Sequence, residues 1–236
     1  MFYNILFCDI ICLMNEEKNM KSIYLSRQEK FSRRFSSFFL GFVFVICLIV
    51  STFNIIFYPA EVFGKSMLPT INKQTEVNSN YRDTVYVSSW FGFSKGDIVI
   101  VDLPDKTEEG IKRLIATGGD VLSFKSGDNK FYLNGSVLEE KYLEKNNAVC
   151  VNKFVTLAMR YISQNNLQGC TITLEDDMYS ITLDEGYCIY LGDNRENSYD
   201  CSNFGPQKVS TILGKVFLIV PYGGNISSAI FHKIFG

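Results

Sequence analysis

The sequence predicts a mainly β domain that follows a single N-terminal transmembrane helix. Three observations predict this fold class: an uncharged apolar stretch close to the N-terminus, short segments of alternating apolar and polar residues after it, and a hydrophobic share of 47%, which is too high for a disordered chain. We therefore expect three parts: a cytoplasmic N-terminal segment over residues 1–34, a transmembrane helix over 35–58, and an extracytoplasmic β-rich domain over 59–236.

The apolar stretch from Phe35 to Tyr58 contains no charged residue. A helix of this length spans ~36 Å, which is enough to cross a hydrocarbon core of ~30 Å with some tilt. A cleaved signal peptide would have a shorter apolar run ending in small residues, whereas this run ends in Asn54, aromatic residues and Pro59. We therefore favour a retained membrane anchor over a cleaved signal or a buried soluble helix.

The charges that flank this stretch predict its orientation. Residues 15–34 are rich in Lys and Arg, whereas residues 59–78 carry only Lys65 and Lys73 as basic residues. The positive-inside rule therefore places the N-terminus in the cytoplasm and the β-rich domain on the far side of the cell membrane. Residues 1–14 are also apolar but too short to span, so either the chain starts at Met20 or this segment lies on the inner leaflet.

After the anchor, a period of two and regularly placed turn residues predict β-strands. Asn134-Gly135 is the strongest hairpin signal, and a helix is expected only around residues 151–161. The expected strands cover residues 84–88, 97–103, 111–116, 131–138 with its hairpin turn, 171–174, 179–183, 187–191 and 215–220.

Composition excludes several classes of function. With 23 basic and 25 acidic residues and a net charge of −2, the chain has no electrostatic footprint for nucleic acid. His232 is the single histidine and no C-x-x-C pair occurs, so most metal clusters and a Ser-His-Asp triad are not expected, and no cofactor is implied. Cys150, Cys170, Cys188 and Cys201 allow three disulfide pairings or free thiols, and the sequence leaves this open.

Three segments are too specific to be explained by packing alone: residues 64–70, 111–120 and 192–200. A serine needs a base to become a nucleophile, and without a usable histidine the remaining candidate is a lysine. A free lysine has a pKa of ~10.4, so such a base must be desolvated. In a strand over 111–116, Lys112 shares a face with Leu114 and Ala116, while Arg113 points the other way. Lys112 is therefore the better base and Arg113 the better structural cation.

Taken together, and in this order after an anchor, the three segments resemble the bacterial type I signal peptidases. The resemblance covers the anchor and nearly all of residues 59–222. The matching residues are Ser66, Met67, Pro69 and Thr70 of an S-M-x-P-T pattern, Lys112, Arg113, Gly119 and Asp120 of a K-R-x-x-x-x-x-G-D pattern, and Gly192, Asp193, Asn194, Arg195, Ser198 and Asp200 of a G-D-N-R-x-x-S-x-D pattern.

The resemblance implies a membrane-anchored serine endopeptidase that removes signal peptides from exported preproteins through an acyl-enzyme, with the lipid bilayer as its other partner. It makes Ser66 the nucleophile, Lys112 the base and Ser198 the hydrogen-bond partner that orients Lys112. The backbone N–H of Ser66 would be one oxyanion donor. Many relatives have a second donor, Ser or Thr, where this chain has Gly64, so that donor stays open. Structural support would come from Met67, Pro69, Arg113, Asp193, Arg195 and Asp200.

One departure from the family pattern concerns the last segment. The family usually continues Asp-Ser-Arg, whereas this chain has Asp200-Cys201-Ser202. The arginine that would pair with Asp200 is absent, so either Arg113, Arg195 or another cation replaces it, or the loop is held less firmly.

Two alternatives stay open beside a general signal peptidase: a dedicated peptidase of the pilin-processing type, and a catalytically inactive, membrane-anchored β-rich binding or scaffold protein. The sequence leaves the oligomeric state undetermined.

Overall fold

The computed structural model describes residues 18, 31–76, 78, 80–104, 109–143, 147–164 and 168–235. Its contacts divide the chain into two units, Met1–Ile55 and Ile56–Gly236. An apolar helix, Phe31–Ile56, is long and apolar enough to cross a membrane by its length and composition. It ends before the expected position because Pro59 lacks the N–H that a continuing helix needs, and Tyr58 already belongs to a strand. Residues 1–14 and Met20 lie outside the described residues.

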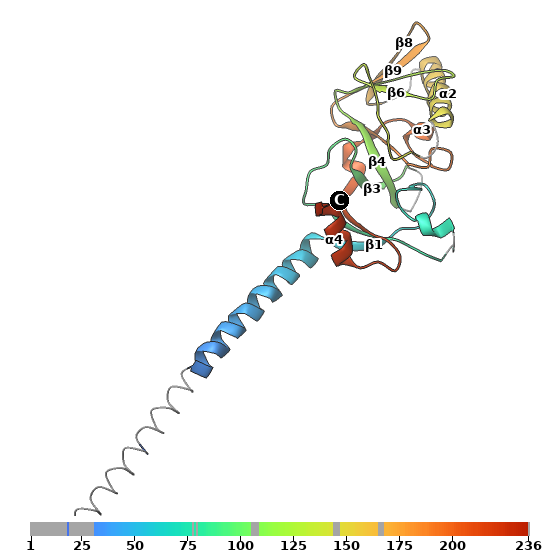
Figure 1. Ribbon diagram of the computed structural model, residues 1–236. Helices are drawn as coiled ribbons and strands as arrows, with labels where there is room; N and C mark the ends of the chain where they lie inside the picture. The colour runs from blue at the N-terminus through green and yellow to red at the C-terminus, as the bar shows by residue number, and fades with distance from the viewer. Residues whose placement is uncertain are drawn as a thin grey trace, which may run out of the picture. The chain divides into compact units, whose positions relative to one another are not determined.

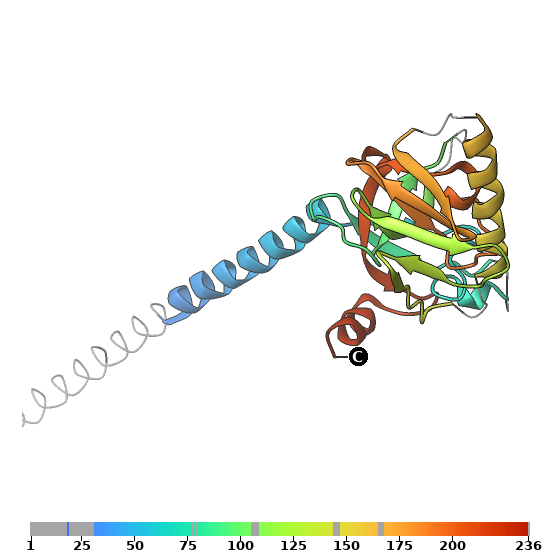
Figure 2. The same ribbon diagram turned by 90° about the horizontal axis from the view of Figure 1, so that it is seen from above.

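The second unit contains two antiparallel sheets, which confirms the mainly β prediction (Figures 1 and 2). The seven-stranded sheet has the order β1-β2-β12-β3-β4-β10-β11, and the five-stranded sheet has the order β7-β6-β5-β9-β8. In chain order the strands are β1 Tyr58–Glu61, β2 Thr84–Ser88, β3 Ile98–Asp102, β4 Glu109–Thr117, β5 Val121–Lys125, β6 Phe131–Leu133, β7 Ser136–Val137, β8 Cys170–Glu175, β9 Met178–Leu183, β10 Tyr187–Leu191, β11 Gln207–Lys208 and β12 Ile212–Val220.

Each strand expected from the alternating pattern is present. The hairpin between β6 and β7 turns at Asn134 and Gly135, whose φ values of 52° and 82° are the left-handed pair that a tight hairpin requires. The expected helix is α2, Ala148–Gln164, which runs alongside the sheets (Figure 2). Four further helices were not predicted, and they are short: η1 Lys73–Glu76, α3 Cys201–Phe204, η2 Val209–Thr211 and α4 Ile226–Phe235.

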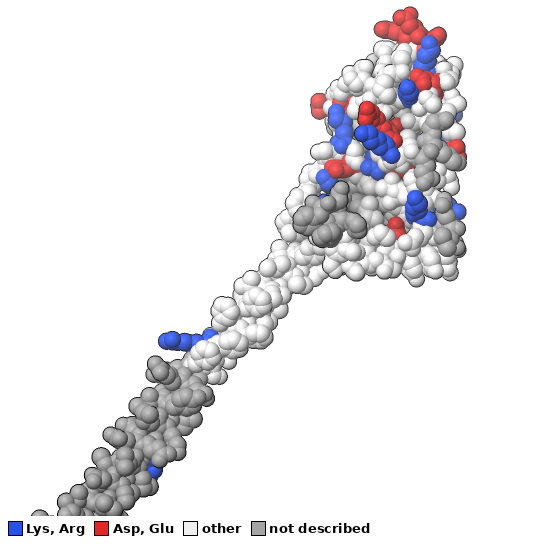
Figure 3. Space-filling view, in the orientation of Figure 1, with Lys and Arg blue, Asp and Glu red and all other residues white. Residues whose placement is uncertain are grey.

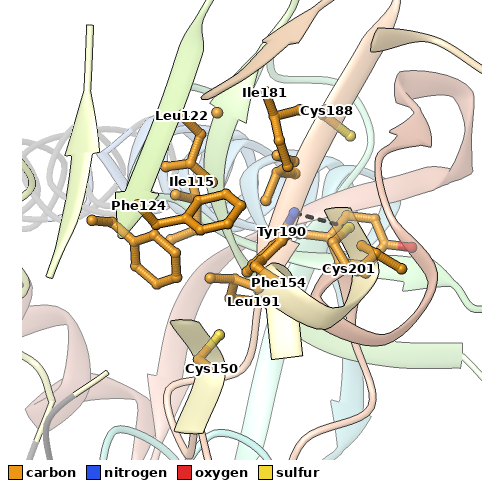
Figure 4. Close-up of a cluster of buried hydrophobic side chains, with 14 of the residues drawn as sticks. Ile115, Leu122, Phe124, Cys150, Phe154, Ile181, Cys188, Tyr190, Leu191 and Cys201 are labelled. Carbon is orange, nitrogen blue, oxygen red and sulfur yellow. Dashed lines mark hydrogen bonds between the residues drawn. The ribbon is translucent and has the colours of Figure 1, made fainter. Parts of the chain in front are cut away.

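The main core lies where both sheets meet α2 and α3, and it is rich in aromatic side chains (Figure 4). The ring centroid of Phe124 lies 6.1 Å from that of Phe131 and 5.4 Å from that of Phe154. These contacts join the five-stranded sheet to α2, and the same core includes buried residues of β4, which carries part of the second motif segment, and of β10, which the third segment follows directly. On the surface, acidic and basic side chains are interspersed over the upper part of the domain (Figure 3).

The cysteines of this unit are free thiols in the structure. Cys150, Cys188 and Cys201 are buried in the main core, and Cys170 is half-buried. Burial raises the pKa of Cys150, Cys170 and Cys188 to about 12. Because the thiolate is the reactive form, these side chains act here as small apolar core groups.

Candidate active site

Ser66 lies in a loop that follows β1 and is anchored by apolar packing. Met67, with 2% of its surface exposed, and Ile71 pack into a small core with Val85, Ile100 and other buried residues of the seven-stranded sheet. The peptide bond between Leu68 and Pro69 is cis. Met67, directly after Ser66, is thus buried, whereas Lys65 before it is exposed and Ser66 itself is half-exposed.

The far end of this loop is fixed by a reciprocal pair of polar side chains. The backbone N–H of Asn72 donates to Asp83 Oδ2 at 2.7 Å, and the backbone N–H of Asp83 donates to Asn72 Oδ1 at 2.8 Å. Asn72 Nδ2 also donates to the carbonyl of Val62 at 2.7 Å. Because these groups are buried, the bonds bring both ends of the loop together and hold its shape.

Lys112 comes from the middle of β4 and reaches this loop. Its Nζ donates to Ser66 Oγ at 3.1 Å and to the carbonyl oxygen of Ile111 at 3.0 Å. Lys112 is only 3% exposed, and removal from water disfavours the charged ammonium form. The structure therefore brings together the two residues predicted to form the dyad, which are 46 positions apart in the sequence.

Asp193 connects all three motif segments. Its carboxylate accepts two bonds from Arg113, from Nε at 2.9 Å and from Nη2 at 2.6 Å, in the parallel arrangement that suits guanidinium and carboxylate. Thr70 Oγ1 donates to the same carboxylate. The Arg113 guanidinium also lies 3.9 Å from the centre of the Tyr142 ring. Through Asp193, Arg113 on the strand of Lys112 is thus linked to the loop of Ser66 and to the third segment.

Gly192 allows the third segment to approach Ser66. The backbone N–H of Asn194 donates to the carbonyl of Ser66 at 2.9 Å. A Cβ atom at Gly192 would lie 2.5 Å from the Ser66 carbonyl oxygen and 2.3 Å from Ser198 Oγ, so only glycine fits this approach. Ser198 Oγ is buried, and within the described part of the chain it has no hydrogen-bond partner. The expected bond between Ser198 and Lys112 is therefore not formed in this structure.

Asp200 is held by neutral donors in place of the arginine that the family pattern would supply. Its Oδ2 accepts from the backbone N–H of Gly192 at 2.9 Å, and its Oδ1 accepts from the backbone N–H and the hydroxyl of Ser202 at 3.0 and 2.7 Å. No ion pair among the described residues involves Asp200. Neither Arg113 nor Arg195 takes over the missing contact, and the loop is fixed by the cap that Asp200 forms on α3.

Arg195 is buried in a separate ionic cluster. Its guanidinium donates to the Glu140 carboxylate and to Asn147 Oδ1, and its Nε donates to the carbonyl of Gly192 at 3.0 Å. Sequence reasoning missed Glu140 and Asn147, because an acidic residue in a polar stretch gives no local sign of a distant partner. It also gave no role to Thr70, although that residue belongs to the matching pattern.

An open groove of about 650 Å³ runs past Ser66 and Lys112. Its lining includes residues 60–66, residues 109–112 of β4, Asn197 and Tyr199. β10 pairs with β4 only over residues 113–117, and β3 pairs with the opposite edge. Within the described residues, Glu109–Lys112 therefore has one edge without a strand partner, and this edge faces the groove.

A serine hydroxyl beside a buried lysine amine, in an open groove, is the arrangement of serine hydrolases that use a lysine base. Comparison with known proteins agrees with this class. The family model described as signal peptidase, peptidase S26, matches residues 35–221. The chain belongs to this family of serine endopeptidases, which cleave signal peptides.

Individual relatives are similar over most of their length. Signal peptidase I of Bacillus licheniformis is 30% identical over 159 residues, which are 67% of this chain and 72% of that protein. Signal peptidase I U of Bacillus subtilis (strain 168) is 26% identical over 208 residues, which are 87% of this chain and 96% of that protein. A crystal structure of a signal peptidase I from Enterococcus faecalis V583, 26% identical, matches 54% of this chain and 99% of that chain with a TM-score of 0.35.

Proposed function

We propose that the chain cleaves signal peptides with Ser66 as the nucleophile and Lys112 as the general base. The observation that carries this proposal is the 3.1 Å contact between Lys112 Nζ and Ser66 Oγ in the groove. Neutral Lys112 takes the proton of Ser66, and Oγ attacks the scissile carbonyl to form an acyl-enzyme. Lys112 then passes its proton to the leaving amine and activates the water that releases the acyl group.

The substrate binds as an added strand on the open edge of Glu109–Lys112. Main-chain hydrogen bonds along this edge would place an extended peptide beside Lys112, in the groove that already contains Ser66. Apolar side chains line the groove at Ala60, Val62, Val85, Ile100 and Ile111. This lining suits small residues, such as alanine, at the first and third positions before the cut.

The oxyanion of the tetrahedral intermediate is stabilised by the backbone N–H of Ser66 as one donor. Gly64 has a φ of +86°, a left-handed conformation that strains any residue with a side chain. A side-chain donor at position 64 is therefore disfavoured in this backbone, which supports a second donor from elsewhere in the groove.

Ser198 orients the amine of Lys112 once a substrate excludes water from the groove. Its hydroxyl is buried near the Ser66 carbonyl and lacks a partner, and such groups are rare unless they serve a function. Met67, Pro69, Arg113, Asp193, Arg195 and Asp200 are assigned structural support, since their contacts hold the loops that carry Ser66 and Ser198. Ser198→Ala should lower kcat while leaving KM close to its original value.

The chain is divided into a cytoplasmic segment over residues 1–34, an anchor around residues 35–58 and an extracytoplasmic domain over 59–236. The Lys- and Arg-rich segment before the apolar helix supports this orientation in the cell membrane. Protease added outside intact spheroplasts should digest the domain and spare a tag at the N-terminus. Digestion of the tag instead would reverse the orientation.

The decisive test is cleavage of a preprotein by the detergent-solubilised full chain. Ser66→Ala and Lys112→Met should each abolish cleavage after an Ala-x-Ala sequence. Matched controls are Ser163→Ala, an exposed serine on α2, and Lys125→Met, an exposed lysine on β5, which should leave the rate unchanged. Cleavage that survives Lys112→Met would mean that another group is the base.

The same assay distinguishes a general signal peptidase from the two alternatives that the sequence left open. If only one or a few preproteins of a panel are cut, and this cleavage depends on Ser66, the chain is a dedicated peptidase of the pilin-processing type. A chain that cuts none of them, although it is folded and inserted, would be a binding or scaffold protein.

A further inference from the structure

The helix α2 is fixed to the domain by its apolar face and carries a polar stripe beside it. Val151, Phe154 and Ala158 are buried in the main core, so the helix cannot shift without opening that core. α3 packs beside α2 (Figure 1), and an open hollow of about 420 Å³ is lined by residues of both helices. Lys153 lines this hollow and is half-buried. The start of its side chain is therefore held in place by the core.

Lys153 reaches from α2 to the third motif segment, residues 192–200. Its Nζ donates to the carbonyl oxygen of Arg195 at 3.5 Å and to the carbonyl oxygen of Ser198 at 3.3 Å. Both bonds are long, but a charged donor binds a carbonyl more strongly than a neutral donor does. A single ammonium group thus joins two points of this segment to the helix.

Ser198 has few other contacts that could fix its position. Its Oγ has no hydrogen-bond partner, and within the described residues the contact from Lys153 is the one hydrogen bond that its backbone makes. Asp200, two residues further on, is fixed by its own bond from the backbone N–H of Gly192. The contact from Lys153 therefore holds the part of the segment that the bonds of Asp200 do not reach.

We propose that Lys153 is a positioning residue for cleavage: it holds the backbone at Ser198 so that the Ser198 hydroxyl can reach the amine of Lys112. This inference rests on the proposed function, in which Ser198 orients Lys112. A free hydroxyl that must make its bond in the complex with substrate depends on a backbone that is already in place. Lys153 supplies this from α2, outside the three motif segments.

The test is a double-mutant cycle on the detergent-solubilised full chain, which measures kcat and KM for cleavage of a preprotein after an Ala-x-Ala sequence. Lys153→Met should lower kcat by about fivefold, the effect of losing one hydrogen bond from a charged donor, and leave KM close to its original value. In a chain that already carries Ser198→Ala, the same substitution should change kcat by less than about twofold, because the hydroxyl that Lys153 positions is gone.

Two further variants serve as controls. Lys153→Arg keeps a positive charge and hydrogen-bond donors, so it should retain more than about half of the original kcat. Arg160→Met removes an exposed cation from the same hollow, two turns along α2, and should leave kcat unchanged. Thermal unfolding verifies that each variant is folded at the assay temperature. If Lys153→Met is not folded, Lys153→Gln, which also removes the charge, takes its place in the cycle.

Two results would overturn the inference alone. One is a full kcat in Lys153→Met while Ser198→Ala is slow. The other is an equal loss from Lys153→Met with and without the Ser198 hydroxyl, since Lys153 would then act on the domain and not through Ser198. A full kcat in Ser198→Ala would overturn the proposed role of Ser198 itself, and this inference with it.

Discussion

The two loops that meet at Ser66 are held in place by different forces. The loop of residues 62–72 is an extension of an apolar core, with Met67 and Ile71 buried beneath the seven-stranded sheet. The loop of residues 192–200 is held by charges and hydrogen bonds around Asp193, Arg195 and Asp200, all of which are buried. The loop of Ser66 is thus anchored mainly by packing, with polar bonds at Thr70 and Asn72, whereas the residues opposite it are positioned by a polar network. Substitutions in the two loops should therefore affect stability and activity in different ways.

The largest effect is expected from breaking the polar loop at Arg195. Arg195→Met leaves the buried carboxylate of Glu140 without its cation, which should lower the free energy of unfolding by about 3–5 kcal/mol. The measurement is chemical denaturation of the full chain in detergent. Adding Glu140→Gln to Arg195→Met should recover part of the loss, because it removes the uncompensated charge.

The matched control for this substitution is Arg160→Met, at an exposed arginine on α2. It should change stability by less than about 0.5 kcal/mol. An equal loss in both arginine variants would show that the cluster around Glu140 contributes nothing specific.

A substitution in the loop of residues 62–72 should lower the stability less than Arg195→Met does, but it should lower the activity directly. Met67→Ala removes a buried side chain next to Ser66 and should cost about 2–4 kcal/mol, depending on how far the loop collapses into the cavity. Because the loop carries Ser66, the proposed nucleophile, cleavage should also slow at temperatures where the protein is fully folded. Met159→Ala, at an exposed methionine on α2, is the control and should alter neither quantity. Full activity in Met67→Ala would show that packing does not position Ser66.

A smaller effect is expected where neutral donors replace the family arginine. Ser202→Ala removes the hydroxyl that donates to Asp200 Oδ1 and leaves two backbone donors on that carboxylate. We expect a loss of about 1–2 kcal/mol in the free energy of unfolding, since a buried charged acceptor loses one bond. Ser123→Ala, which removes a half-buried bond to Ser180, tests whether any lost hydroxyl bond has the same effect. Similar values for both would contradict the special role of Ser202.

The comparison of the two loops also explains how far the sequence could predict the molecule. Alternation along residues 111–116 predicted that Lys112 and Arg113 face opposite ways, because a strand's faces are encoded in adjacent residues, and the two side chains contact different partners, Ser66 and Asp193. The partners of Arg195 and Asp200 were not predictable, because Glu140 lies 55 residues away and Ser202 stands where the family has arginine. α4 was missed although Asn225 caps it by accepting from the backbone N–H of Ser228 at 2.8 Å, because its polar residues are spread around the helix and leave no clear apolar stripe in the sequence.

The smallest effect concerns an ionic contact outside both loops, between buried Asp120 and exposed Lys95, which shows how a partly exposed pair differs from the buried network. Burial alone would raise the pKa of Asp120, but hydrogen bonds from Lys95, the backbone of Thr117 and Asn134 outweigh it and hold the pKa below its usual value. A carboxyl whose pKa is lower in the folded state stabilises the fold above its unfolded pKa of ~3.9, and this contribution is lost as the pH falls below that value.

Asp120→Asn should therefore lower stability slightly at neutral pH and flatten the loss of stability below about pH 4. The change at neutral pH should stay below about 1 kcal/mol, because Lys95 is largely in water. Asp177→Asn, at an exposed aspartate 3.8 Å from Lys125, should leave the whole pH profile unchanged. Denaturation midpoints measured across the acid range compare the two. If Asp120→Asn proved as costly as Arg195→Met, the exposure of Lys95 would not limit how strongly this ionic contact holds the domain together.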